Sequence, residues 1–137
     1  MIEGAIHNPS RPQHFMQVDR MDQKVQVKFG DLKIADTDRA LRLQEVGRRI
    51  YQPQYYIPRE DVPASLRKTE KSTLCPLKGH ASYYSLVDDA GEELAEELGW
   101  SYEDPFEFAE QISGYIAFDP RRVTITVEAA KARRLAG

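Results

Sequence analysis

Short runs of alternating polar and apolar residues, each closed by a turn-forming residue, restrict the fold of this chain more than any other feature. Residues 24–29 and 123–127 alternate strictly, which is the period of a strand with one buried face. No regular alternation of strands with long helical patterns runs through the chain, so a parallel sheet with crossover helices is disfavoured. The sequence therefore predicts a mainly β domain of short antiparallel strands with one or two short helices.

The expected strands differ in how clearly the residues specify them. Residues 39–46 also favour a helix, but the segment is too short for a stable isolated one, so we expect a strand. Residues 51–57 contain Pro53 and precede Pro58; proline lacks a backbone donor, so this strand should lie at a sheet edge or end near each proline. The expected strands span residues 24–29, 32–35, 39–46, 51–57, 66–74, 80–87, 100–102, 114–118 and 123–127.

Two segments predict short helices. Leu94 and Leu98 lie four residues apart in the Glu-rich segment 92–98, which gives one apolar helical face, although the segment is short enough to be a loop. Asp104 followed by Pro105 is typical of a helix start, with Asp as the cap and Pro at the first helical position, and the apolar face then runs to Ile112.

Length and composition limit the domain organisation and the classes of partner. The 137 residues favour one domain, with an irregular segment at 1–21, a β domain at 22–128 and a basic tail at 129–137. A net charge of −3 gives no reason to expect a nucleic acid or an anionic membrane as partner. No apolar run reaches the roughly 18 residues of a membrane span. The first residues lack the basic and apolar parts of a secretory signal, and the single cysteine excludes an internal disulfide, so we expect a cytoplasmic protein.

Cys75 is the candidate catalytic residue. Lys78 follows three residues later and His80 five residues later, and either cation would stabilise a thiolate nucleophile. The alternative is a packed, inert cysteine at a strand end. One cysteine without paired ligand spacing predicts no metal site, and no motif predicts a cofactor.

Three dense segments supply the candidate ligand-binding residues. Arg59 and Glu60 would bind a polar ligand through a guanidinium fork, or form a structural turn. Lys78 before Gly79 would present an ammonium and backbone donors to an anion, or be a solvated turn residue. The aromatic candidates are Tyr56, Tyr83 or Tyr84, Trp100, Tyr102 and Tyr115, of which we select Tyr84, Trp100 and Tyr115 for the cleft. Neighbours such as Tyr83 and Tyr84 should point to opposite faces of a strand.

Four ordered motifs between residues 24 and 127 resemble the domain-of-unknown-function family DUF427. They are Tyr55-Tyr-Ile-Pro-Arg-Glu-Asp-Val62, Cys75-Pro-Leu-Lys-Gly79 with Ala81-Ser-Tyr-Tyr84, Trp100-Ser-Tyr102 with Pro105, and Gly114-Tyr-Ile-Ala-Phe118 with Arg121. The resemblance implies a single compact β-tent-like domain. Many proteins of that architecture hold zinc with four cysteines, which this chain does not have. The family is also catalogued as a putative nucleotidyltransferase domain, but the chain has no Gly-Ser pair leading into spaced carboxylates and no phosphate-binding loop.

These observations lead to two hypotheses of different classes. The first is a domain that binds a small anionic ligand in an aromatic-lined cleft, with Cys75 as the nucleophile if the protein is an enzyme. The second is a protein-interaction or self-association module that uses an exposed edge strand near Pro53 and Pro58. A homo-oligomer is compatible with either.

Overall fold

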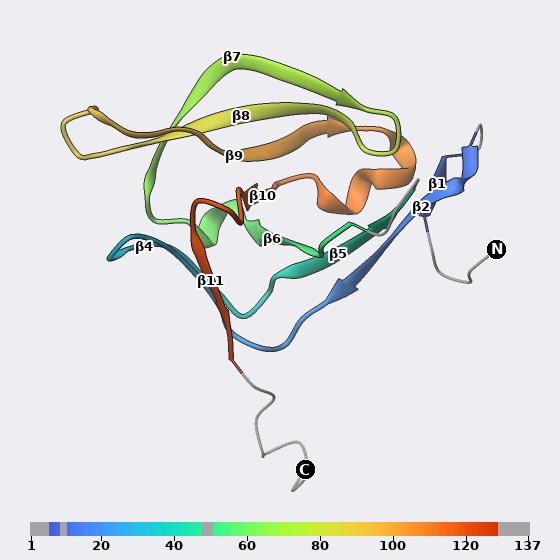
Figure 1. Ribbon diagram of the computed structural model, residues 1–137, viewed down its shortest axis with the longest axis horizontal. Helices are drawn as coiled ribbons and strands as arrows, with labels where there is room; N and C mark the ends of the chain where they lie inside the picture. Colours follow the sequence, from blue (N-terminus) through green and yellow to red (C-terminus); the bar gives the residue numbers. More distant parts are fainter. Residues whose placement is uncertain (1–5, 9–10, 48–50, 129–137) are drawn as a thin grey trace, which may run out of the picture.

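The computed structural model describes residues 6–8, 11–47 and 51–128, and within them the strands form two antiparallel sheets (Figure 1). The eight-stranded sheet has the order β1 (Ile6–Asn8), β2 (Arg11–Arg20), β5 (Leu41–Val46), β6 (Gln54–Pro58), β10 (Tyr115–Phe118), β9 (Glu93–Pro105), β8 (Gly79–Val87) and β7 (Ser65–Cys75). The three-stranded sheet has the order β11 (Thr124–Val127), β3 (Val25–Phe29) and β4 (Leu32–Thr37). The mainly β, antiparallel fold class predicted from the sequence is confirmed, including the strand at 39–46.

The prediction of a helix at 92–98 is wrong, because this segment begins the long strand β9. Ala95 and Leu98 are buried, whereas Leu94 is exposed. The register against β8 shifts here, and Glu97 takes a positive φ of 50°. This bulge breaks the period of two and leaves the buried residues three positions apart, a spacing that resembles a helical face. Pairing with β8 therefore overrides the weak preference of a two-turn helix.

The second expected helix is a 3-10 segment, η2 (Glu107–Ile112), rather than a helix opened by Asp104 and Pro105. Pro105 is the last residue of β9 and pairs with Gly79, and Phe106 precedes the segment without a side-chain cap. A second 3-10 turn, η1 (Arg59–Asp61), occupies the predicted turn after β6. Within the described residues, no helix has the length and apolar character needed to cross a membrane.

Much of the segment expected to be irregular, 1–21, is a strand. Residues 11–20 form β2, which pairs with β5 from Phe15 opposite Val46 to Arg20 opposite Leu41. Met16 is fully buried. Gln17, Asp19 and Arg20 of this strand are exposed, whereas Val18 is partly buried. The segment is polar overall, so its composition resembled that of a loop. Residues 1–5 and 9–10 and the basic tail at 129–137 lie outside the described residues.

Strand β6 lies inside the large sheet, between β5 and β10. Pro53 precedes it and Pro58 is its last residue, opposite Tyr115, so the predicted strand ends are confirmed. The alternative prediction of an edge position is wrong, because neighbouring strands take the backbone groups of β6 on both sides. The exposed edge near Pro53 and Pro58 that the interaction hypothesis requires is therefore occupied by the sheet itself.

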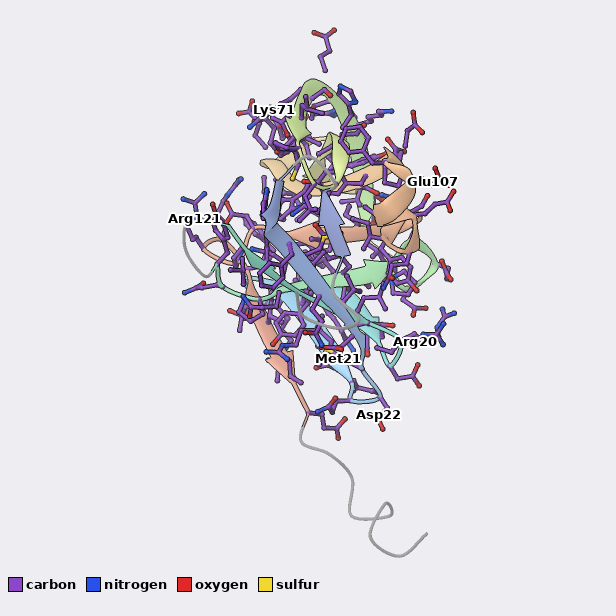
Figure 2. All side chains as sticks on the ribbon, turned by 90° about the vertical axis from the view of Figure 1, so that its right-hand side faces the viewer. Arg20, Met21, Asp22, Lys71, Glu107 and Arg121 are labelled. Carbon is purple, nitrogen blue, oxygen red and sulfur yellow. The ribbon has the colours of Figure 1, made fainter. Side chains whose placement is uncertain are left out.

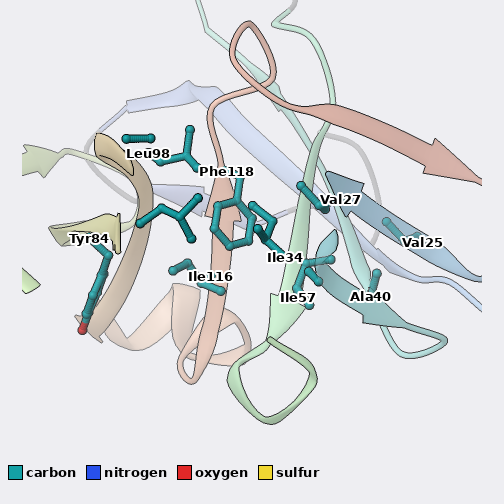
Figure 3. Close-up of a cluster of buried hydrophobic side chains, with 12 residues drawn as sticks. Val25, Val27, Ile34, Ala40, Ile57, Tyr84, Leu98, Ile116 and Phe118 are labelled. Carbon is teal, nitrogen blue, oxygen red and sulfur yellow. The ribbon is translucent and has the colours of Figure 1, made fainter. Parts of the chain in front are cut away.

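Two buried clusters lie on opposite faces of the large sheet. Alternate residues of β6 and β10 belong to different clusters: Tyr56 and Ala117 to one, Ile57 and Ile116 to the other. The Phe118 cluster, shown in Figure 3, fills the space toward the small sheet and consists of Val25, Val27, Ile34, Ala35, Ala40, Ile57, Tyr84, Leu86, Ala95, Leu98, Ile116 and Phe118. The Tyr56 cluster consists of Met16, Leu41, Leu43, Tyr56, Leu77, Ala81, Tyr102, Ala109, Ile112 and Ala117.

Candidate ligand-binding site

A pocket with a volume of about 920 Å³ opens on the face of the large sheet that carries the Tyr56 cluster. Segments far apart in the chain meet around it, from β5, β6, the β7–β8 hairpin, β9 and the turn after β10. Its aromatic lining includes Tyr56, Tyr83, Trp100 and Tyr102, and its charged lining comprises Lys71, Lys78, Arg121, Arg122, Glu45, Glu97 and Asp119. The pocket therefore combines flat apolar surface with charges of both signs.

The aromatic wall is set by strand pairing. Tyr83 on β8 and Trp100 on β9 are direct cross-strand partners, with ring centroids 6.5 Å apart and planes tilted by 42°. The Trp100 indole Nε1 donates to the Tyr56 hydroxyl at 3.3 Å, and the Lys71 Nζ lies 4.5 Å from the centre of the Tyr83 ring. Contacts on both sides therefore hold the orientation of the wall.

A tight turn between β7 and β8 carries Lys78 into the protein. Leu77 is fully buried and anchors the turn in the Tyr56 cluster. Gly79 has a φ of +109°, and a Cβ there would lie 2.9 Å from the backbone nitrogen of Phe106. That nitrogen donates to the Lys78 carbonyl at 3.0 Å. Only glycine allows this approach, so Gly79 is required to place the Lys78 side chain, which is just 9% exposed.

Lys78 forms a buried charged chain with Glu45 and His14. The Lys78 Nζ lies 2.5 Å from Glu45 Oε1, and His14 Nε2 lies 2.8 Å from Glu45 Oε2. Burial opposes ionisation of Glu45, but the Lys78 charge, supported by the Lys78 and His14 hydrogen bonds, holds the pKa of this carboxyl below its usual value. Burial alone would lower the pKa of Lys78. Interactions with Tyr56 and Glu45 outweigh the effect of burial and raise this pKa. The pair is therefore ionised and its net charge is zero.

The rim of the pocket carries more cationic than anionic side chains. Lys71 Nζ lies 3.6 Å from Glu97, and the Arg121 guanidinium lies 3.2 Å from Asp119. Arg122 donates to the backbone carbonyls of Glu96 and Glu97 at 2.7 and 3.4 Å; among the described residues, no carboxylate lies within ion-pair distance of it. Figure 2 shows Lys71 at one end of the molecule and Arg121 on the flank opposite Glu107. No carboxylate of the described residues would therefore compete at ion-pair distance with an anionic ligand for Arg122.

The structure brings only some of the sequence-predicted site residues together. Cys75, Lys78 and Trp100 line the pocket. The four other candidates, Arg59, Glu60, Tyr84 and Tyr115, are not part of its lining. The binding and catalytic roles predicted for these residues stay predictions.

Each of the four candidates outside the pocket lining interacts with another residue that is also outside it. The Arg59 guanidinium lies 4.9 Å above the Tyr84 ring, and the Tyr84 hydroxyl donates to Glu103 at 2.7 Å. Glu60 is exposed and pairs with Arg39 at 3.3 Å. The Tyr115 backbone carbonyl accepts from Ser101 Oγ at 2.6 Å. Arg59 and Tyr84 consequently contact each other on the sheet face that carries the Phe118 cluster.

Of the tyrosine pair on β8, Tyr84 was selected for the cleft. Tyr83 and Tyr84 do point to opposite faces, as predicted, but Tyr83 lines the pocket and Tyr84 belongs to the Phe118 cluster. Glu45 was missed, although a signal was present. It continues the alternation of Leu41 and Leu43, so it is a carboxylate on the buried face of an apolar strand. Charged residues are rarely buried without a partner, so that position indicates a buried ion pair.

The described residues contain no group of three or more His, Cys, Asp and Glu side chains that could hold a metal ion.

A family model described as a domain of unknown function, DUF427, matches residues 17–129. No curated protein matches the chain significantly. The match spans the pocket-forming strands from β5 to β10 together with the turn that carries Arg121 and Arg122.

Proposed function

This chain belongs to the family described as a domain of unknown function, DUF427, and we propose that its pocket binds a small anionic ligand with a flat apolar part. The observation that carries the proposal is the coexistence of an aromatic wall and a cationic rim around one cavity. Its volume of about 920 Å³ suits a small molecule, since ligand pockets usually measure about 300–1,000 Å³.

The charges around the pocket support an anion rather than a cation. Among the lining residues of the described structure, four lysines and arginines stand against three carboxylates, in a chain whose net charge is −3. The sign of the local charge is therefore opposite to that of the whole protein. Arg122 contributes most, because its guanidinium has a fixed fork of donors that matches carboxylate and phosphate groups.

The aromatic wall supports a flat group next to the anion. Tyr83 and Trp100 present ring surface that is held by strand pairing and by the hydrogen bond to Tyr56, so little side-chain entropy is lost when a ligand stacks on it. The classes that combine both features are aromatic carboxylates and phosphorylated ring compounds.

A ligand screen tests the proposal. Thermal midpoints should rise by several degrees with nucleotides, sugar phosphates or aromatic carboxylates, because a ligand at a hundred times its Kd stabilises a fold by about 2.7 kcal/mol. The variant Arg122→Gln should then weaken binding about tenfold by calorimetry. Arg59→Gln is the matched control, since Arg59 lies on the other face. Binding by no anion, or equal losses in both variants, would reject the proposal.

Cys75 carries the second candidate function, catalysis by a thiolate. It lines the same pocket as Lys78, so a bound ligand would lie within the space that the sulfur also faces. Bound ligand should slow alkylation of Cys75 by iodoacetamide, measured by mass spectrometry. If the protein is an enzyme, Cys75→Ala should abolish turnover of a pocket ligand while its Kd changes less than about threefold. Retained turnover would exclude the nucleophile.

A further inference from the structure

Two buried tyrosine hydroxyls lie at the base of the pocket without an acceptor. Tyr56 is 1% exposed, and its oxygen accepts the hydrogen bond from Trp100. Tyr102 is 7% exposed. Among the described residues, neither hydroxyl donates a hydrogen bond to any protein group. Buried polar groups are nearly always paired, because leaving one unpaired costs free energy, so two such donors in one place call for an explanation.

Both hydroxyls are surrounded by residues that line the pocket. Burial has the largest effect on the pKa of the Tyr56 hydroxyl and raises it. The groups with the next largest effects on this pKa are Lys78, Trp100, Glu45 and Cys75. Burial also raises the pKa of Tyr102, with Tyr56 and Cys75 as the next contributors. The two side chains come from β6 and β9 and belong to the same cluster. Both tyrosines therefore belong to the buried part of the lining of one pocket.

The Lys78 ammonium adds donors at the same place. Its Nζ lies 5.6 Å from the centre of the Tyr102 ring and has three N–H groups, of which Glu45 takes one. Because Glu45 also neutralises the lysine charge, the base of the pocket offers hydrogen-bond donors without a net positive charge. Moving a second anion there would carry a large desolvation penalty that no spare cation offsets. A neutral oxygen acceptor suits this environment better.

We propose, on the basis of the ligand-binding role above, that the base of the pocket is a subsite for a neutral carbonyl oxygen of the ligand. The Tyr56 and Tyr102 hydroxyls and the Lys78 ammonium donate to this oxygen, while the anionic group of the ligand stays at the rim near Arg122. The ligand class is therefore a small anion that also carries a ketone, amide or ester carbonyl next to its flat part.

The first test uses the protein without ligand. A hydroxyl that donates to the protein lowers the thermal midpoint by roughly 2–5 °C when it is removed. Tyr102→Phe should change the midpoint by less than about 1 °C or raise it, whereas Tyr56→Phe should lower it because the Trp100 indole loses its acceptor. Tyr84→Phe is the matched control and should lower it, because that hydroxyl donates to Glu103 at 2.7 Å. A loss at Tyr102 equal to that at Tyr84 would reveal a protein acceptor for the Tyr102 hydroxyl and overturn the subsite.

The second test uses two anionic probes that differ in one carbonyl group, 4-benzoylbutyrate and 5-phenylpentanoate. The unmodified protein should bind 4-benzoylbutyrate about tenfold more tightly, and the double variant Tyr56→Phe, Tyr102→Phe should abolish this preference. Arg122→Gln should weaken both probes by the same factor. Equal affinities in the unmodified protein would reject the subsite alone. Absence of binding by both probes would reject the subsite together with this class of ligand.

Discussion

The two faces of the large sheet use similar residues in opposite ways. On one face the Tyr84 hydroxyl donates to Glu103, and the ring lies under Arg59 at the margin of the Phe118 cluster (Figure 3). On the other face Tyr56 and Tyr102 are also buried, yet neither hydroxyl has a protein acceptor among the described residues. A tyrosine next to a cation is thus a structural element on the first face and an incompletely paired group on the second. Hydrogen-bond satisfaction, rather than residue type, distinguishes the candidate site.

The largest expected effect concerns the buried ion pair. Glu45→Gln leaves the Lys78 charge buried with a weaker partner, and breaking such a pair typically costs about 3–5 kcal/mol. Glu60→Gln removes a carboxylate that is 63% exposed and pairs with Arg39, which should cost less than about 1 kcal/mol. Urea unfolding of both variants measures the difference. Similar losses would mean that the pocket face is no more dependent on charge pairing than the surface.

The second expected effect concerns the turn that places Lys78. Gly79→Ala combines a φ of +109° with a Cβ position 2.9 Å from the Phe106 backbone nitrogen, so we expect a loss of about 3 kcal/mol. Gly91→Ala has a φ of +83° and nothing within 4 Å, so it should cost only about 1 kcal/mol. Thermal and urea unfolding report both values. Equal costs would show that crowding against β9 contributes nothing.

The pH dependence of stability gives a smaller effect on the same pair. Because the folded pKa of Glu45 lies below its ordinary value of 4.5, the stabilisation by ionised Glu45 is fully present above about that pH. It disappears as pH falls through the lowered folded value. The stability difference between the unmodified protein and Glu45→Gln should therefore shrink in acid, measured by urea unfolding at stepwise lower pH. A difference that grows in acid would contradict the ionised pair.

The smallest expected effect lies on the opposite face. Arg59→Gln removes an exposed guanidinium 4.9 Å above the Tyr84 ring, a contact worth about 0.5–1 kcal/mol. Its unfolding free energy should fall by no more than that. Tyr84→Phe in the Arg59→Gln background should still show the loss of the Glu103 hydrogen bond, because that bond does not involve the guanidinium. An Arg59→Gln loss above 2 kcal/mol would indicate a role for Arg59 that its contacts do not explain.

Much of the fold was readable from local pattern, and the site was readable only in part. The alternation in 24–29 predicted β3 correctly, whereas the bulge at Glu97 gave β9 the spacing of a helix. Cys75, Lys78 and Trp100 were selected because their segments are dense in reactive and aromatic residues, and all three line the pocket. The ion pair of Glu45 was not found, because its partners His14 and Lys78 lie 31 and 33 residues away in the chain.

The amino-acid sequence by itself determined the strand period, and with it the fact that Tyr83 and Tyr84 face opposite sides of the sheet. Only the tertiary structure decided which side is hollow. Alternation is a property of neighbouring residues, whereas a cavity depends on how β5, β9 and the β7–β8 hairpin pack across long sequence separations. For the same reason, Arg59 and Lys78, equivalent candidates in the sequence, lie apart in the folded protein.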